Sequence, residues 1–194
     1  MTRDNLADLT AFSESHGKFR YCSCMRWRLT SSEFSGCTAA ERAQRLEALV
    51  KAGTPVGVLA YAPNTRIRVR LEGRPRGAAA ERKPVGWCSV APRETYSGLE
   101  RYKALARVDD APVWSVTCFF IDADWRRQAV TLGLLRAAVE YAAASEARVV
   151  EGYPVEPGPR LYTYMGSPST FQKAGFTDVT PPGRQRRVMR CRTG

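Results

Sequence analysis

The segment from residue 113 to residue 153 constrains the fold of this chain most. Residues 113–121 are apolar on both faces, which indicates a strand in the centre of a sheet. A basic turn at residues 125–128 then leads into a long helix whose apolar positions follow helical spacing, and residues 148–153 form the next strand. This strand, turn, helix and strand predict an α/β fold for the chain.

The basic turn is also the best candidate for a binding site. The backbone amides at the start of a helix have no partner within the helix, so they point toward whatever lies before it. Arg126 and Arg127 add positive charge at this point. The turn therefore predicts a phosphate-binding site.

The rest of the chain predicts further helices and strands around this unit. Residues 5–16 suit a short helix, and the aromatic-rich residues 19–28 suit a strand. Thr38 and Glu41 form a capping box that starts a helix, which Gly53 ends. Further strands are predicted at residues 55–61, 66–71 and 84–90, short helices near 99–105 and from 167, and a hairpin from 177–180 and 187–192.

Residues 126–131 resemble a motif of the GNAT superfamily of acyl-CoA-dependent N-acetyltransferases. That motif, Arg/Gln-x-x-Gly-x-Gly/Ala, joins a strand to a helix, and its amides hold the pyrophosphate of coenzyme A. Arg126 matches the motif, whereas Ala129 and Thr131 replace its two small residues. The resemblance implies a cofactor-binding turn made of Arg126, Arg127, Gln128, Ala129, Val130 and Thr131.

The resemblance also implies where protons and charge are handled during transfer. Glu151 follows two apolar residues in its strand, where similar family members use a glutamate as general base. Asp109 and Asp110 are rival bases, and a water chain is a further alternative. An amide of the preceding strand would stabilise the oxyanion. The strand residues implied to contact the acyl-coenzyme are Phe119, Phe120 and Ile121.

A second family signature, Tyr-x-x-x-Gly-Phe, is similar to residues 171–176. The family tyrosine protonates the departing thiolate, but this chain has Phe171 at that position. Tyr164, seven residues earlier, is the candidate replacement for the acid, with nearby hydroxyl side chains or water as alternatives. Phe171 itself is then expected to contact the coenzyme.

Taken as a whole, the resemblance implies a GNAT-like α/β (α+β) fold: a mixed, largely antiparallel twisted sheet flanked by helices. We expect one acetyltransferase domain over residues 1–194, with a basic insertion at about 62–83. The implied activity is transfer of an acetyl group from acetyl-CoA to an amine by direct attack. The acceptor is a small molecule or a peptide amine, or an aminoacyl group on RNA.

The charge of the chain keeps a different class of function open. Its 30 basic and 19 acidic residues give a net charge of +11, which suits a polyanionic partner, although GC-rich coding also favours arginine. The alternative is a nucleic-acid-binding module on the same fold with a degenerate coenzyme cleft. Residues 74–76, Arg-Pro-Arg, are similar to the core of an AT-hook, and a flexible basic loop is the competing interpretation.

Several other classes are disfavoured by composition. A single histidine, His16, argues against multi-histidine zinc catalysis, and Cys22 with Cys24 is the only closely spaced cysteine pair, so no metal site is expected. Cys88 and Cys118 lie in apolar runs and are expected in the core. No apolar run approaches the ~20 residues that span a bilayer, and the N-terminus lacks a signal-peptide pattern, so we expect a cytoplasmic protein without membrane contact. A homodimer is among the options for its assembly.

Overall fold

A six-stranded sheet organises the part of the chain that the computed structural model describes, which is residues 1–62, 83–156, 158 and 163–194. The strand order is β1-β2-β3-β4-β6-β5; β3 and β4 pair in parallel and all other neighbours are antiparallel. The predicted mixed, largely antiparallel sheet is thereby confirmed. The strands are β1 (Val58–Tyr61), β2 (Pro84–Pro92), β3 (Trp114–Ile121), β4 (Val149–Gly152), β5 (Thr177–Asp178) and β6 (Met189–Arg192).

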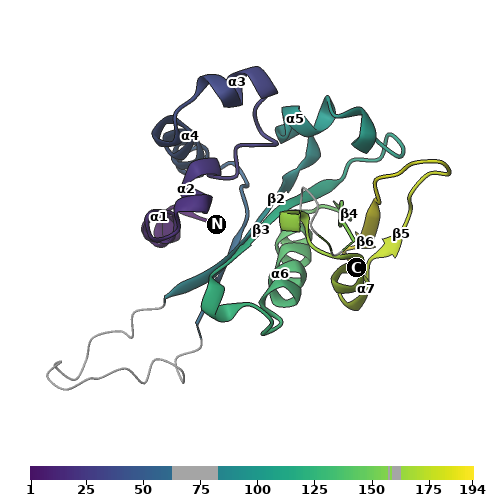
Figure 1. Ribbon diagram of the computed structural model, residues 1–194. Coiled ribbons are helices and arrows are strands. Elements are labelled where there is room, and N and C mark those ends of the chain that lie inside the picture. Colours follow the sequence, from purple (N-terminus) through teal and green to yellow (C-terminus); the bar gives the residue numbers. More distant parts are fainter. Residues whose placement is uncertain (63–82, 157, 159–162) are drawn as a thin grey trace, which may run out of the picture.

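Helices cover both faces of the sheet (Figure 1). The first four lie on one face, while α6 and α7 lie on the other, where α6 packs on β1, β2 and β3. The helices are α1 (Leu6–Ser15), α2 (Gly17–Cys22), α3 (Ser31–Gly36), α4 (Ala39–Lys51), α5 (Ser97–Glu100), α6 (Val130–Ala144) and α7 (Pro168–Lys173). None of the described helices has the length and apolar character that crossing a bilayer requires.

Local signals explain where most helices begin. Thr38 and Glu41 form the predicted capping box at the start of α4. Thr30 and Glu33 form a second box before α3, which the sequence analysis missed. Ser167 caps α7, and Gly175 follows that helix with a φ of 89°. These side chains satisfy amides that have no partner inside the helix.

The strand predicted at residues 19–28 is wrong. The chain instead forms α2 and then a series of turns, in which Ser23 and Cys24 have left-handed backbone angles. The guanidinium of Arg42, which is buried, donates hydrogen bonds to the carbonyl oxygens of Tyr21, Phe34 and Cys37. Packing against this distant side chain satisfies the backbone without a sheet partner, so it outweighs the strand preference of aromatic residues.

Other boundaries differ in detail from the expectations. The strand expected from residue 55 begins at Val58, and the helix expected near residues 99–105 is α5 followed by a 3-10 turn, Lys103–Leu105. The strand at residues 66–71, the Arg-Pro-Arg segment and nearly all of the expected insertion at about 62–83 lie outside the described residues.

A bulge in β3 turns its second half relative to the rest of the sheet. Ser89 of β2 pairs with Cys118 and Val90 pairs with Val116, so Thr117 is an extra residue without a partner on β2. Beyond the bulge, Phe119 packs in the core under α6, whereas Phe120 packs with α1 and α2. The bulge thus sets which β3 side chains face the N-terminal helices.

The close contact between Gly152 and Phe171 generates a stability prediction. A Cβ built on Gly152 would lie 2.1 Å from Cε1 of the Phe171 ring, which is itself fully buried. We expect Gly152→Ala to lower the free energy of unfolding by at least ~2 kcal/mol, because neither the strand nor the ring has room to move. Chemical denaturation measures this change.

Gly36→Ala is the matched control. Nothing lies within 4 Å of the position of its Cβ, and Gly36 ends α3 without a positive φ. The control should be neutral or stabilise the fold by up to ~1 kcal/mol. Equal effects of the two substitutions would show that Phe171 does not hold β4 in the way described.

Candidate functional site

The two parallel strands in the middle of the sheet separate before β3 ends. β4 pairs with β3 only at Trp114, Ser115 and Val116, and β4 itself ends at Gly152. The remaining residues of β3, 117–121, extend beyond this pairing, and the 3-10 turn Thr163–Met165 packs beside them. The sheet therefore opens between β3 and β4, toward the end where α6 begins.

The N-terminus of α6 has chemical properties that suit an anion. No described side chain caps it, and its first turn contains no acidic residue. Ala129 precedes the helix with a left-handed φ of 58°, and Arg127 has a φ of 60°. The first amides of α6 thus keep their hydrogen-bonding capacity, and the helix dipole adds partial positive charge.

The turn before α6 is folded back onto the end of β3. Nε of Arg126 donates to the carbonyl oxygen of Ile121 at 3.3 Å, and Nε2 of Gln128 donates to that of Asp124 at 2.7 Å. Residues 126–129 are all exposed. The predicted cofactor-binding residues of the turn are therefore together at the surface, with the amides of Val130 and Thr131 directly behind them.

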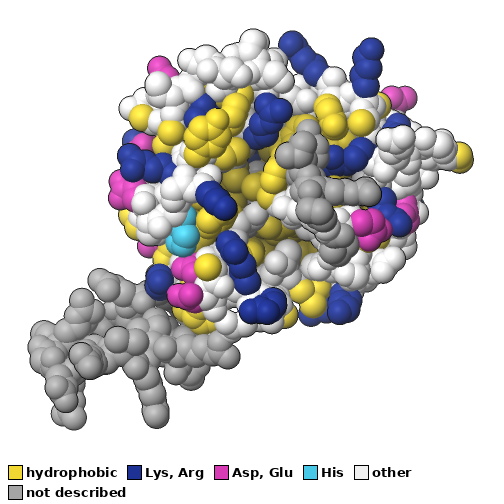
Figure 2. Space-filling model, viewed as in Figure 1, with side chains coloured by type: hydrophobic (Ala, Val, Ile, Leu, Met, Phe, Trp, Pro, Cys, Tyr) yellow, Lys and Arg dark blue, Asp and Glu magenta, His cyan; other side chains and the backbone are white. Residues whose placement is uncertain are grey.

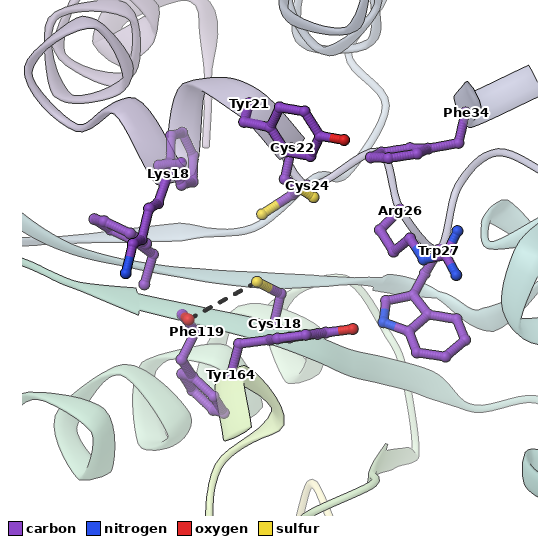
Figure 3. Close-up of a pocket in the computed structure, with 12 residues that line it drawn as sticks. Lys18, Tyr21, Cys22, Cys24, Arg26, Trp27, Phe34, Cys118, Phe119 and Tyr164 are labelled. Atoms are coloured by element: carbon purple, nitrogen blue, oxygen red, sulfur yellow. Dashed lines mark hydrogen bonds between the residues drawn. The ribbon is translucent and has the colours of Figure 1, made fainter. Parts of the chain in front are cut away.

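An apolar cavity of about 410 Å³ lies on the other face of the sheet, between α2 with its following turns and the second half of β3. Figure 3 shows Tyr21, Cys22 and Cys24 on one side of it and Cys118, Phe119 and Tyr164 on the other. Because Phe119 and Tyr164 also belong to the opening beside β3, the cavity reaches the place where the strands separate. Its aromatic wall consists of Phe19, Tyr21, Trp27, Phe34, Phe119, Phe120 and Tyr164.

The charged residues around this cavity are cations. Lys18 and Arg26 are exposed and lie at opposite ends of it, and none of the described residues that line it is Asp or Glu. Figure 2 shows hydrophobic side chains in a hollow of the surface with Lys and Arg side chains around it. The cavity therefore suits an apolar ligand that carries negative charge.

The thiols of the cavity are neutral groups. Burial raises the pKa of Cys22 to about 11. A hydrogen bond with Cys118, together with complete burial, raises the pKa of Cys24 well above its ordinary value. Since a thiolate is the reactive form of cysteine, Cys22 and Cys24 serve as soft apolar wall rather than as nucleophiles at neutral pH. Cys118 is half-buried and faces the cavity, instead of lying in the core as expected.

Glu151 lies inside a buried network of charged groups. It is 1% exposed, and its Oε1 accepts hydrogen bonds from Nη1 of Arg93 and the hydroxyl of Tyr153, each at 2.7 Å. Its Oε2 accepts from Nε of Arg190 at 2.7 Å. Complete burial, and then the charge of Glu151, raise the pKa of Tyr153 well above its usual value, so that hydroxyl remains a donor. This geometry favours a structural role for Glu151, and its catalytic role stays a prediction.

The rival carboxylates have different surroundings. Asp109 accepts two hydrogen bonds from Arg190, at 2.6 and 3.0 Å, and this contact holds the pKa of Asp109 below its ordinary value. Asp110 is exposed. Neither aspartate lines the cavity. Asp109 therefore belongs to the same network as Glu151.

The two aromatic candidates differ in accessibility. Tyr164 lines the cavity and is half-buried, so its ring is accessible from the opening beside β3. Phe171 is fully buried and packs edge-on against Phe119 and Phe176, with ring centroids 6.2 and 4.9 Å away. A coenzyme contact by Phe171 stays a prediction and would need the ring to become exposed.

Sequence reasoning missed most residues of the cavity and of the buried network. Tyr21 and Arg26 fell within the segment interpreted as a strand, and Lys18 directly precedes it, so no sequence signal indicated that these residues surround one space. Arg93 contacts Glu151 across 58 positions of sequence, and it lies in a polar stretch that carries no motif. Within the described residues no group of three or more His, Cys, Asp or Glu side chains could hold a metal ion.

Comparison with known proteins gives similarity in structure only. No family model and no curated protein sequence matches the chain. It is similar to the crystal structure of a ribosomal-protein-alanine N-acetyltransferase from Brucella melitensis, with 16% identity over 96% of this chain and 95% of that chain, at a TM-score of 0.49.

Two further structures are similar at lower TM-scores. A putative acetyltransferase of the GNAT family from Desulfovibrio desulfuricans is 10% identical over 81% of this chain and 82% of that chain, with a TM-score of 0.44. The AtaTR complex bound with AcCoA is 11% identical over 60% of this chain and 62% of that chain, with a TM-score of 0.36.

The left-handed residue before α6 generates a prediction about stability. A side chain makes the conformation of Ala129 unfavourable, and glycine adopts it without that cost. We expect Ala129→Gly to raise the free energy of unfolding by about 1 kcal/mol, measured by chemical denaturation. Ala137→Gly, in the interior of α6, should have the opposite sign and a similar size. Destabilisation by both changes would contradict the assigned backbone of the turn.

The buried network generates a second prediction. Glu151→Gln removes the charge that Arg93 and Arg190 share, and leaves Arg93 buried beside a neutral amide. We expect the free energy of unfolding to fall by about 3 kcal/mol, because breaking a buried pair strands the partner charge. Glu140→Gln on the exposed side of α6 is the control and should change it by less than ~0.5 kcal/mol. A neutral result for Glu151→Gln would rule out the structural role.

Proposed function

We propose that this protein is an acyl-CoA-dependent N-acetyltransferase that transfers an acetyl group from acetyl-CoA to an amine acceptor. The observation that carries the proposal is the opening between β3 and β4, with the cavity bordering it and the uncapped N-terminus of α6 following the end of β3. The N-terminus of α6 suits a pyrophosphate, and the cavity suits an acceptor. A thioester lying between them would reach both.

The turn before α6 would hold the pyrophosphate of the donor. The first amides of α6 supply hydrogen bonds, and Arg126 and Arg127 supply charge. The backbone of residues 119–121 would lie along the acyl chain, on the part of β3 that β4 does not pair with. The turn fits the group in one further respect: its backbone at Ala129 has the left-handed shape that the family motif reserves for glycine.

The transfer would proceed by direct attack of the amine. The nitrogen attacks the thioester carbonyl carbon, the carbon–sulfur bond breaks, the amine loses a proton and the thiolate gains one. An amide of β3 would stabilise the negative oxygen that forms in between. We assign the proton for the thiolate to Tyr164, which borders both the cavity and the opening.

The proton of the amine would leave through water in this proposal. No carboxylate of the described residues lines the cavity, and both oxygen atoms of Glu151 accept hydrogen bonds from the side chains of Arg93, Tyr153 and Arg190. Glu151, the base predicted from the family resemblance, is the alternative proton acceptor. Kinetics can distinguish Glu151 from water. The basicity of the acceptor decides whether a protein base is needed, because a weakly basic amine is already neutral at pH 7.

Coenzyme binding is the first test of the proposal. Saturating acetyl-CoA should raise the melting temperature; ligand at 100 times its Kd stabilises a fold by about 2.7 kcal/mol. Arg126→Ala should weaken binding by about tenfold or more, because a charge-assisted hydrogen bond to phosphate is lost. Arg148→Ala, beyond the far end of α6, is the control and should bind normally. Absence of binding in calorimetry would refute the proposed function.

The two proton-transfer assignments are tested by steady-state kinetics over a pH series. If water accepts the proton, Glu151→Gln should keep kcat within about tenfold once only folded protein is counted, whereas loss of a general base costs about 10²–10⁴-fold. Tyr164→Phe should lower kcat and leave coenzyme affinity unchanged. If kcat of the folded Glu151→Gln variant falls by about 100-fold or more, Glu151 is the general base and the assignment to water is wrong.

A further inference from the structure

We infer that the acceptor of this enzyme is a weakly basic amine on an aromatic body that also carries an anionic group, of which an aminobenzoate is the simplest example. The inference rests on the proposed function and specifies its substrate class. It excludes polycationic amines such as polyamines and aminoglycosides. Three properties of the cavity beside β3 lead to this inference. Its wall is aromatic, its charged lining residues are cations, and no described carboxylate lines it.

The wall of the cavity selects a flat apolar body. Trp27 and Phe34 are buried, while Tyr21 is 62% exposed and is the most accessible large hydrophobic side chain in the described chain. The thiols of Cys22 and Cys118 add polarisable surface between these rings (Figure 3). Aromatic rings and sulfur atoms both pack favourably against a further ring. The volume, about 410 Å³, lies at the small end of ligand sites and suits a molecule with one or two rings.

The charge of the cavity selects an anion. Lys18 and Arg26 lie at its two ends, and the side chain of Arg26 is 5.5 Å from the ring centroid of Phe34. Neither cation has an ion-pair partner among the described residues. A carboxylate on the acceptor would therefore complement charges that the described protein leaves unbalanced. A cationic acceptor would meet two like charges there and no carboxylate among the described lining residues.

Because no described carboxylate lines the cavity, a weakly basic amine suits it better than a strongly basic one. A strongly basic amine enters as an ammonium ion, which loses its hydration in an apolar cavity and gains no negative partner in this one. It would also need a base, and Glu151 is fully engaged by other side chains. An aromatic amine is already neutral at pH 7, so it enters without that cost and can attack the thioester directly.

A panel of four acceptors tests the inference with the full chain and acetyl-CoA. The compounds are para-aminobenzoate, aniline, para-(aminomethyl)benzoate and spermidine, which vary the anion, the basicity and the net charge in turn. We expect kcat/KM to be highest for para-aminobenzoate, by about tenfold or more over each of the others. A preference for spermidine or for the aminomethyl compound would overturn the inference.

Reversing the charge of the two cavity cations tests whether the preference for an anionic acceptor arises at the cavity. Replacing both cations, Lys18→Glu with Arg26→Glu, should raise KM for para-aminobenzoate by about tenfold and leave KM for aniline nearly unchanged. Arg20→Glu with Arg45→Glu is the control matched in net charge, because both are exposed arginines, on α2 and α4, that do not line this cavity. Equal effects of the double variant and the control would show that only net charge matters, and would refute the assigned site.

Binding measurements separate a failure of this inference from a failure of the proposed function. If acetyl-CoA does not bind, the proposed function fails, and calorimetry with para-aminobenzoate alone still tests the cavity. Binding that the double charge reversal weakens supports the assigned ligand chemistry. If acetyl-CoA binds and para-aminobenzoate neither binds nor reacts, the function stands and the substrate class is wrong.

Discussion

The buried contact between Arg93 and Glu151 fixes the end of the sheet at which β3 and β4 pair. Both side chains are 1% exposed, so their charges are stabilised by each other and by the groups around them. Arg93 follows β2 and donates to Glu151, Tyr153, Glu100 and the carbonyl oxygen of Leu105. Arg190 of β6 holds the second oxygen of Glu151. One carboxylate thus connects β2, β4 and β6, and the hydroxyl of Tyr153 extends the connection to Ser115 of β3.

The opening between β3 and β4 follows from this fixed end. The two strands pair at three positions beside the network and then separate, where Phe171 packs against Gly152 and the turn Thr163–Met165 packs beside β3. The bulge at Thr117 turns the free part of β3 so that Cys118 and Phe120 face the N-terminal helices. The buried charged network would in this way position both the proposed donor site and the proposed acceptor cavity.

The sequence predicts the elements whose signals are local. The apolar run of β3, the helical spacing of α6 and the capping box of Thr38 each depend on neighbouring residues, and all three are confirmed. The strand predicted at residues 19–28 is wrong because local turns bond several of its carbonyl groups and Arg42, a residue on another helix, bonds that of Tyr21. The network of Glu151 and the cavity could not be predicted, since their members come from separate segments and no spacing connects them.

The central claim is that acetyl-CoA lies in the opening between β3 and β4. Amide hydrogen exchange with and without acetyl-CoA tests this claim most directly. We expect the backbone amides of residues 118–121 in β3 and 130–132 in α6 to exchange more slowly when acetyl-CoA is added. Exchange near Arg93 and Glu151 should not change, because those groups are already buried and paired in the free protein. Protection confined to other surfaces, or none at a saturating coenzyme concentration, would contradict the account.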